Sequence, residues 1–420
     1  MTEGKLTKSP IYVPFKYYSF LVLLYIFIYN PSFSFLPVSP LELLLVPALL
    51  FIGLCNNWAK LLYTFKYELS AFALILIFNL LRELGSGGNI FFRANIFLLL
   101  QSIIFPYCII LLYSQLKNHN NLLKDIIVVG SIASFITLLM IFVPSLADTV
   151  RYKLLETDDF TELVSFRSFG ISDGLTFGYG IAQGIIFALA MYYSKQNLKY
   201  LPLLIFLLIS VLFNARIGLF PIALSLVYFL ILEFNIKLLL IILGVGTFVY
   251  LMIFCTDFFS DYARTIEWAF DFFTQSSDFV SGNAASSDSN TFNTLFSDMA
   301  ILPHNLREWI IGTGENVFVS PTANSDIGYI IQLYYGGISY ILLFTLLIGG
   351  MMTRLRFLYK KNKWLIIILL VTLIVTNLKG LTISMIPSFR LIMLIYCYLI
   401  IEYVKRDKQE KKDFDLISFQ

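Results

Sequence analysis

The residues of this sequence that are best suited to chemistry are arginines and one aspartate beside long apolar runs. Arg167 lies in the stretch SFRSFGISDGLTFGYGIA, and Arg216 lies in LFNARIGLFPIALSL, between two apolar runs. Asp326 begins the stretch DIGYIIQLYYGGISYILLF. A guanidinium group offers a planar fork of donors that grips phosphate or carboxylate in two places, and a carboxylate beside such groups is suited to act as a general base. These residue types together indicate a site for an anionic ligand.

Glycines accompany the first of these arginines. Gly170 follows Arg167 closely, and ten residues separate Arg167 from Gly178. Glycine lets the backbone approach a ligand and leaves its N–H groups free to point at it. A helix expected to begin near Gly174 would direct its positive end at the same place. The alternative is an ordinary helix start, with Asp173 as N-cap and the glycines serving tight packing.

Arg216 and Asp326 each have a purely structural alternative as well. A cation at membrane depth is costly and normally faces a cavity or a partner, which makes Arg216 a functional candidate. The two runs beside it fit either a hairpin or one broken helix, and in a hairpin Arg216 would simply mark the membrane interface. The position of Asp326 at the start of an apolar run also fits an N-cap.

Four further cations complete the expected ligand-binding set. Arg264 lies in FSDYARTIEWAFDFFTQ, which is expected to be an amphipathic helix on the membrane surface, and Arg307 lies in MAILPHNLREWIIGTGEN. Lys379 and Arg390 bracket a short turn, where they either close a basic rim or mark the membrane boundary. His304, close to Arg307, is expected to be an ordinary surface residue rather than a base.

The elements that position these residues are expected to be membrane helices. The chain has 420 residues, 58% hydrophobic and 14% charged, with mean hydropathy +0.79, whereas a soluble domain carries about 25% charged residues. Apolar runs near the length needed to cross a bilayer recur throughout. We therefore expect an all-α polytopic membrane protein of about twelve transmembrane helices, at residues 17–36, 38–54, 67–82, 94–113, 125–143, 174–194, 199–214, 216–232, 237–256, 326–350, 364–381 and 385–404.

The lysines and arginines predict which loops lie on which side. With the N-terminus in the cytoplasm, the inner side holds 17 Lys and 3 Arg, and the outer side holds 8 Arg and 2 Lys. This agrees with the positive-inside rule and places both termini in the cytoplasm. An Arg-rich outer face indicates an anionic ligand there, although outer arginines also snorkel to lipid headgroups or pair with loop acids.

The same reading divides the chain into four parts. Residues 1–256 hold the first nine helices, with a smaller outer loop near 144–173, and residues 257–325 form a large outer loop with short helices. Residues 326–404 hold the last three spans, and 405–420 form a cytoplasmic tail. The sequence has no Gly-rich phosphate loop, no Cys-x-x-Cys spacing and no cluster with metal-ligand spacing, so no cofactor, metal or nucleic acid is expected.

These pieces together resemble the O-antigen polymerase (Wzy) family and, more distantly, the O-antigen ligases. FRSFGISDGLTFG resembles the family's Arg–ten residues–Gly pattern, and NARIGLF resembles its Arg-containing turn, in which Ser usually stands at the place of Ala215. GTGENVF and the later NSDIGYIIQLYYGGISYILLF resemble its Gly-x-Gly stretch and its Asp/His–Gly–Tyr entry into a Gly-containing helix. Ligases usually carry His near the start of the tenth span, where this chain has Asn324, Ser325 and Asp326, which favours a polymerase.

The resemblance implies a GT-C-like glycosyltransferase of the bacterial inner (plasma) membrane with a periplasmic active site. Such an enzyme joins undecaprenyl-diphosphate-linked repeat units, for lipopolysaccharide and other surface polysaccharides, without a metal or a nucleotide sugar. Its partners would be the lipid-linked oligosaccharide, as donor and acceptor, membrane lipid and a chain-length regulator. The catalytic residues would be Asp326 and Arg216, and the substrate would be bound by Arg167, Gly170, Gly178, Arg264, Arg307, Lys379 and Arg390.

Two other functions stay open at this point. An O-antigen ligase is the closest enzymatic alternative, and a flippase for lipid-linked oligosaccharides is the alternative from another class. A flippase needs charges that line a cavity within the spans, whereas the expected spans are almost free of charge. This difference favours the polymerase.

Overall fold

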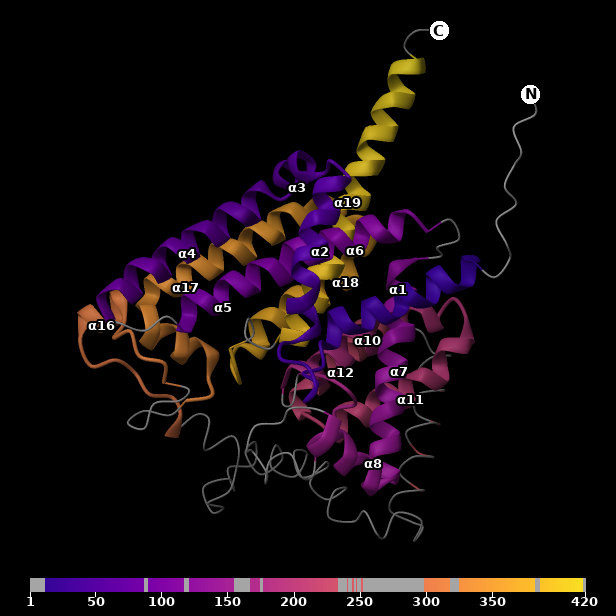
Figure 1. Ribbon diagram of the computed structural model, residues 1–420, viewed down its shortest axis with the longest axis horizontal. Helices are drawn as coiled ribbons and strands as arrows, with labels where there is room; N and C mark the ends of the chain where they lie inside the picture. The colour runs from indigo at the N-terminus through magenta and orange to yellow at the C-terminus, as the bar shows by residue number, and fades with distance from the viewer. Residues whose placement is uncertain are drawn as a thin grey trace.

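The computed structural model describes residues 12–86, 90–116, 121–154, 167–173, 177–232, 298–317, 325–381 and 386–417, together with Leu240, Gly244, Thr247 and Leu251. Within these residues the fold is all-helical, without strands (Figure 1). The all-α prediction is therefore confirmed. The expected helix around Arg264 and nearly all of the segment 237–256 lie outside the described residues.

The helices follow the apolar runs of the sequence closely. The first half of the chain forms α1 (Tyr12–Tyr29), α2 (Pro40–Leu54), α3 (Trp58–Thr64), α4 (Lys66–Ser86), α5 (Ile90–Leu99), η1 (Leu100–Ile104), α6 (Phe105–Ser114), α7 (Leu122–Phe142), α8 (Pro144–Thr149), η2 (Val150–Leu154) and α10 (Phe177–Ser194). The second half forms η3 (Leu198–Tyr200), α11 (Leu201–Leu212), η4 (Arg216–Gly218), α12 (Leu219–Leu226), η5 (Val227–Leu232), α16 (Leu306–Ile311), α17 (Gly328–Leu355), η9 (Arg356–Leu358), α18 (Tyr359–Thr376) and α19 (Ile386–Ile417). Part of the expected outer loop at 144–173 is thus helical.

Four of the described helices are long and apolar enough to cross a membrane. They are Ala94–Ser114, Leu122–Phe142, Gly328–Leu358 and Ile386–Val404. A fifth is counted if α2 and α3, which meet at a bend of 100°, form one span. Shorter apolar helices lie at Phe15–Tyr29, Leu198–Leu212, Arg216–Leu230 and Asn362–Thr376. The described residues thus contain several membrane-compatible helices but do not reach the expected twelve spans.

The outward faces of several helices are apolar. On α2, Leu50 is 60% exposed and Leu54 is 87% exposed, and on α4 Leu84 is 77% exposed. Leu342 and Leu346 of α17 are exposed in the same way. Contiguous exposed apolar surface on this scale is unusual for a soluble monomer and is what a helix presents to lipid.

Helix α10 forms the centre of the fold. Helix α10 is buried along almost its whole length and packs against α7, α11, α12 and α19. Its glycines allow this, because small residues let helix backbones approach closely. A Cβ added at Gly180 would lie 2.7 Å from the carbonyl oxygen of Ala215, and one at Gly184 would meet the backbone oxygen of Gly218. The close approach holds η4, which begins at Arg216, against α10.

Helices α4 and α17 form a second layer, side by side along the upper left of Figure 1. Gly336 makes the contact possible, because a Cβ there would come within 2.7 Å of the ring of Phe78 on α4. Gly336 therefore permits close packing of α17 against α4. Gly337 has a different role, since it breaks α17 with φ +67° and ψ −166°.

The break in α17 is completed by the Gly-Thr-Gly turn at residues 312–314. The carbonyl oxygen of Tyr334 accepts hydrogen bonds from the backbone N–H groups of Thr313 at 2.7 Å and Gly314 at 3.2 Å, and from the Thr313 hydroxyl. The turn therefore satisfies a carbonyl beside the break. Gly312 has φ +71°, and a Cβ there would meet the backbone nitrogen of Gly336 at 2.6 Å.

We expect Gly337→Ala to lower the free energy of unfolding by about 1–3 kcal/mol. An alanine would be strained at this positive φ, and its Cβ would come within 2.4 Å of the Ile310 backbone. The matched control is Gly350→Ala in the same helix, where a Cβ meets no atom within 4 Å and where alanine is favoured over glycine by about 0.5–1 kcal/mol. Thermal unfolding of the purified variants in detergent measures both, and equal midpoints for the two variants would contradict this account.

Candidate functional site

The segment that carries Arg167 is held against the end of α11. The backbone N–H of Ser168 donates to the carbonyl oxygen of Phe213 at 2.9 Å, three residues before Arg216. The buried guanidinium of Arg151 donates to the carbonyl oxygen of Arg167. These contacts bring Arg167 and Arg216 to one place, although nearly fifty residues separate them in the chain.

Asp326 and Lys379 are brought together by the packing of α17 against the end of α18. The N–H of Tyr329 donates to the carbonyl oxygen of Asn377 at 3.3 Å. Gly328 lies so close to this turn that a Cβ would come within 2.4 Å of the Asn377 side chain. Ser325, which is buried, donates to the Met299 carbonyl at 2.7 Å and fixes the chain just before Asp326.

The two pairs form a single group, which we call the charged cluster: Arg167, Arg216, Lys379 and Asp326. All four side chains are half-buried. Burial lowers the pKa of Lys379, and the nearby charges of Arg216 and Arg167 lower it further, while Asp326 raises it. Burial and the charge of Arg216 likewise lower the pKa of Arg167. Burial raises the pKa of Asp326, and Lys379 opposes that change.

The cluster carries three cations and one carboxylate. A bound anion reduces the mutual repulsion among partly desolvated cations. Arginine grips phosphate in two places, lysine adds a point charge, and a carboxylate of raised pKa is suited to exchange protons. The arrangement can therefore hold a phosphate or diphosphate group next to a proton acceptor.

The glycines predicted to bind substrate lie close to the cluster by sequence but are tightly packed. Gly170 has φ +60°, and a Cβ there would lie 3.1 Å from the carbonyl oxygen of Ala133. Gly178 is buried in the first turn of α10. The positive φ of Gly170 explains the choice of glycine there.

Two of the arginines predicted to bind substrate are not among the residues of the charged cluster. The N-cap role considered for Asp326 and Asp173 is compared with the structure here as well. Arg307 is exposed on α16, and the described contacts do not bring it to the cluster, while Arg264 lies outside the described residues. Asp326 does not cap α17, because Ile327 takes the N-cap position and no side chain bonds there. Asp173 pairs with Arg390, and residues 174–176, where α10 was expected to begin, lie outside the described residues.

Arg390 is the most deeply buried charged residue of the predicted set. Its side chain is 1% exposed and lies 2.8 Å from a carboxylate oxygen of Asp173. The guanidinium also donates to the carbonyl oxygen of Ile28, and Asn30 donates to the same carboxylate. These contacts tie α19 to the end of α1 and to the segment before α10, so in this structure Arg390 joins helices.

Two residues near the cluster were not singled out from the sequence. Arg151 orients Arg167 through its carbonyl group, and its role has no local signal because the contact spans sixteen residues. Asn214 lies two residues before Arg216, is fully buried, and makes no side-chain hydrogen bond to a described residue. An amide in an otherwise apolar stretch is the signal that could have identified it, because a buried amide normally has a partner.

Among the described residues, no three His, Cys, Asp or Glu side chains gather as a metal site requires. Comparison of the chain with models of protein families, with curated proteins and with solved structures found no match. The function is therefore inferred from the charged cluster and from the motifs of the sequence.

Proposed function

We propose that this protein is an O-antigen polymerase that joins undecaprenyl-diphosphate-linked repeat units by glycosyl transfer at the outer face of the bacterial inner membrane. The observation that carries the proposal is the charged cluster. Its four residues come from four separate stretches of sequence, three of which resemble motifs of the family. An excess of positive charge at the end of apolar helices suits a diphosphate whose lipid tail stays in the membrane.

In the proposed reaction, a hydroxyl of the acceptor sugar attacks the anomeric carbon of the growing chain. The bond from that carbon to the diphosphate oxygen breaks, and the diphosphate leaves with the electron pair. Arg167, Arg216 and Lys379 stabilise the charge that develops on the leaving group, which is where fixed cations lower a barrier most. Asp326 accepts the proton of the attacking hydroxyl.

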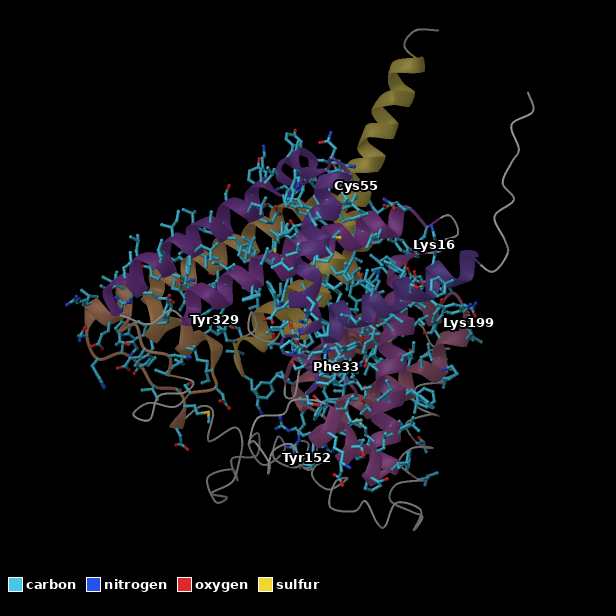
Figure 2. The ribbon with its side chains drawn as sticks, in the orientation of Figure 1. Lys16, Phe33, Cys55, Tyr152, Lys199 and Tyr329 are labelled. Atoms are coloured by element: carbon cyan, nitrogen blue, oxygen red, sulfur yellow. The ribbon has the colours of Figure 1, made fainter. Side chains whose placement is uncertain are left out.

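The placement of residues from the predicted inner and outer loops supports the proposal. Figure 2 shows Cys55 near the top of the molecule and Lys16 and Lys199 at its right, whereas Tyr152 lies near the bottom and Tyr329 at the left. The first three belong to segments predicted to be cytoplasmic, Tyr152 belongs to the predicted outer loop at 144–173, and Tyr329 lies near the outer end of the predicted span 326–350. The proposed topology has twelve spans, both termini in the cytoplasm and the cluster at the periplasmic end.

The test is an assay of purified protein in vesicles with lipid-linked repeat units. A polymerase makes longer lipid-linked glycans and releases undecaprenyl diphosphate. Transfer of a single unit or chain to lipid A would indicate a ligase, and movement of the intact lipid across the bilayer without elongation would indicate a flippase. Either of those results would overturn the proposal.

The rate of elongation is expected to follow a bell-shaped pH profile. Asp326 must be ionised to accept a proton, so the rate rises as the pH passes through its raised pKa. Lys379 must be charged to bind diphosphate, so the rate falls as the pH passes through its lowered pKa. In Lys379→Arg the guanidinium stays charged, and only the alkaline limb moves to higher pH.

The matched control for this profile is Lys363→Arg, at the opposite end of α18. It is expected to leave both limbs where they are in the unsubstituted protein. Initial rates measured between about pH 4 and pH 10 cover the range in which aspartate and lysine side chains titrate in proteins. An alkaline limb that stays in place in Lys379→Arg would exclude Lys379 as its source.

A further inference from the structure

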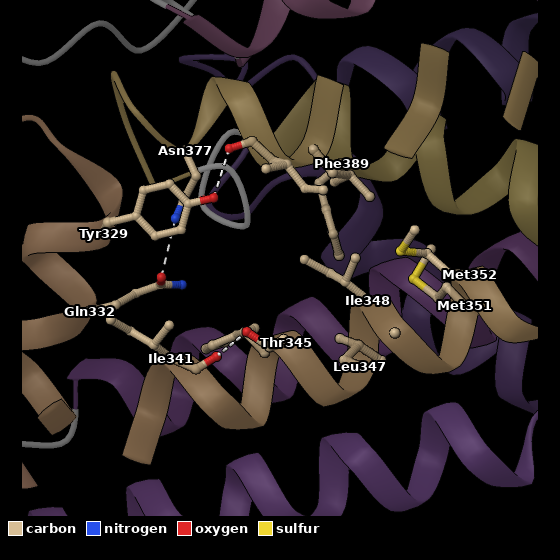
Figure 3. Close-up of a pocket in the computed structure, with 14 residues that line it drawn as sticks. Tyr329, Gln332, Ile341, Thr345, Leu347, Ile348, Met351, Met352, Asn377 and Phe389 are labelled. Carbon is tan, nitrogen blue, oxygen red and sulfur yellow. Dashed lines mark hydrogen bonds between the residues drawn. The ribbon is translucent and has the colours of Figure 1, made fainter. Parts of the chain in front are cut away.

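An apolar cleft of about 280 Å³ runs between α17, α18 and α19. Figure 3 shows this cleft with its lining side chains drawn as sticks. Its walls are mainly Phe344, Leu347, Ile348 and Met351 of α17, Leu373 of α18 and Phe389 of α19. Methionine is flexible and adapts to chains of irregular shape. The cleft therefore suits a hydrocarbon rather than a polar ligand.

One end of the cleft is polar and adjoins the charged cluster. Tyr329, Gln332 and Asn377 lie there, and Asn377 donates to the side-chain oxygen of Gln332 at 3.2 Å (Figure 3). Asn377 precedes Lys379 by two residues, and Tyr329 follows Asp326 by three. A ligand that extends from the cluster into the cleft therefore passes these three polar side chains before it reaches the apolar walls.

The cleft also opens to the outside of the helix bundle. Two of its lining residues are largely exposed, Met352 at 45% and Ile374 at 44%. The neighbouring face of α17 is apolar and exposed as well. A chain held in the cleft can thus continue into the surrounding lipid without crossing a polar barrier.

We propose that this cleft holds the polyprenyl chain of the lipid diphosphate whose head lies in the charged cluster. The inference rests on the proposed function and deepens it by giving the tail of the substrate a site. The cations of the charged cluster complement a diphosphate, and the apolar walls of the cleft complement a hydrocarbon chain. Because the two adjoin, they suit one molecule that carries both groups. Each methylene taken up by the cleft is removed from water, which favours binding, and the gain is smaller for a chain that comes from lipid.

The chain offers a matched pair of substitutions for a test. Gly349 and Gly350 are neighbours on α17, and at both positions a Cβ meets no atom within 4 Å. Gly349 lines the cleft and Gly350 does not. Gly349→Phe is therefore expected to fill the cleft, whereas Gly350→Phe adds the same ring outside it.

The experiment uses the full-length protein in nanodiscs and a polyprenyl diphosphate that bears a photoreactive diazirine on its chain and no sugar. We expect the probe to label peptides of α17 and α18, and we expect Gly349→Phe to lower the yield at least tenfold while Gly350→Phe matches the unsubstituted protein. Inorganic diphosphate, which needs only the cluster, is expected to bind both variants equally. This binding shows that a loss of labelling is not a loss of folding.

Several results would overturn the inference. They are equal labelling of the two variants, labelling confined to other helices, and full competition by phosphatidylglycerol, which would make the cleft an ordinary lipid contact. Because the probe carries no sugar, its binding is independent of glycosyl transfer. If the protein binds the probe in the cleft but does not elongate glycans, this inference stands and the proposed function fails. If it elongates glycans but does not bind the probe in the cleft, the proposed function stands and this inference fails.

Discussion

Arg216→Ala is expected to lower the rate of glycan elongation by about 10²–10³-fold, which is the effect of removing one preorganised group that stabilises developing charge. Arg216 lies at the start of η4, where the close packing of Gly218 against Gly180 fixes its backbone. Its charge acts on Arg167 and on Lys379, so the three side chains share one electrostatic environment. Removal of one cation leaves the leaving group less stabilised in the transition state.

The loss in Arg216→Lys is expected to be intermediate. Lysine keeps the charge but lacks the planar fork that binds two phosphate oxygens. The double variant Arg167→Ala/Arg216→Ala should lose less than the product of the two single losses, because both side chains act on the same leaving group. Initial rates with purified protein and lipid-linked repeat units measure all three effects.

The control is Arg356→Ala, which removes an exposed arginine beyond the other end of α17. We expect it to elongate glycans at the unsubstituted rate. Thermal unfolding of each variant separates loss of activity from loss of structure. A normal rate for Arg216→Ala in folded protein would remove Arg216 from the site and with it the central support of the proposed function.

The second large effect concerns stability. Arg390→Ala is expected to lower the free energy of unfolding by about 3 kcal/mol. The substitution leaves the carboxylate of Asp173 mostly buried without its cation and frees the Ile28 carbonyl, and such broken pairs cost about 3–5 kcal/mol. The expected cost lies at the lower end of this range because the Asp173 side chain is 15% exposed, so water partly solvates the unpaired carboxylate.

Asp173→Ala should be destabilising to a similar degree, because it leaves the buried guanidinium unpaired. The double variant should cost less than the sum of the single costs, since neither charge is then left alone. Arg307→Ala, which removes an exposed arginine on α16, should leave the unfolding curve unchanged. Denaturant titration in detergent measures these values. Strict additivity in the double variant would mean that Asp173 and Arg390 are not coupled.

Arg390 and its neighbour Lys379 show where prediction from sequence reaches its end. Lys379 and Arg390 bracket one short turn and are equivalent as sequence patterns, since each is a cation beside an apolar run. The structure places Lys379 among the charges of the cluster and gives Arg390 a carboxylate partner in a distant segment. No local signal separates the two, because the deciding contacts come from residues distant in the sequence, such as Arg167 and Arg216 for Lys379 and Asp173 for Arg390.

The sequence by itself determined the helical class and the position of most helices. The runs predicted at 94–113 and 125–143 correspond to the membrane-compatible helices Ala94–Ser114 and Leu122–Phe142, because length and hydrophobicity are local properties. Arg216 and Asp326 could be selected in the same way, since a charged residue at the end of an apolar run is conspicuous wherever the fold puts it, and Arg167 could be selected by its spacing from Gly178.

Only the tertiary structure decided which of these residues meet. The break in α17 at Gly337 is an example. The Tyr334 carbonyl beside this break is satisfied by the Gly-Thr-Gly turn at 312–314, which belongs to another segment of the chain. The charged cluster depends in the same way on close approaches at Gly180, Gly218 and Gly328. Such contacts join segments far apart in the chain, and a backbone approach of this kind depends on the shapes of both partners, which neither segment encodes alone.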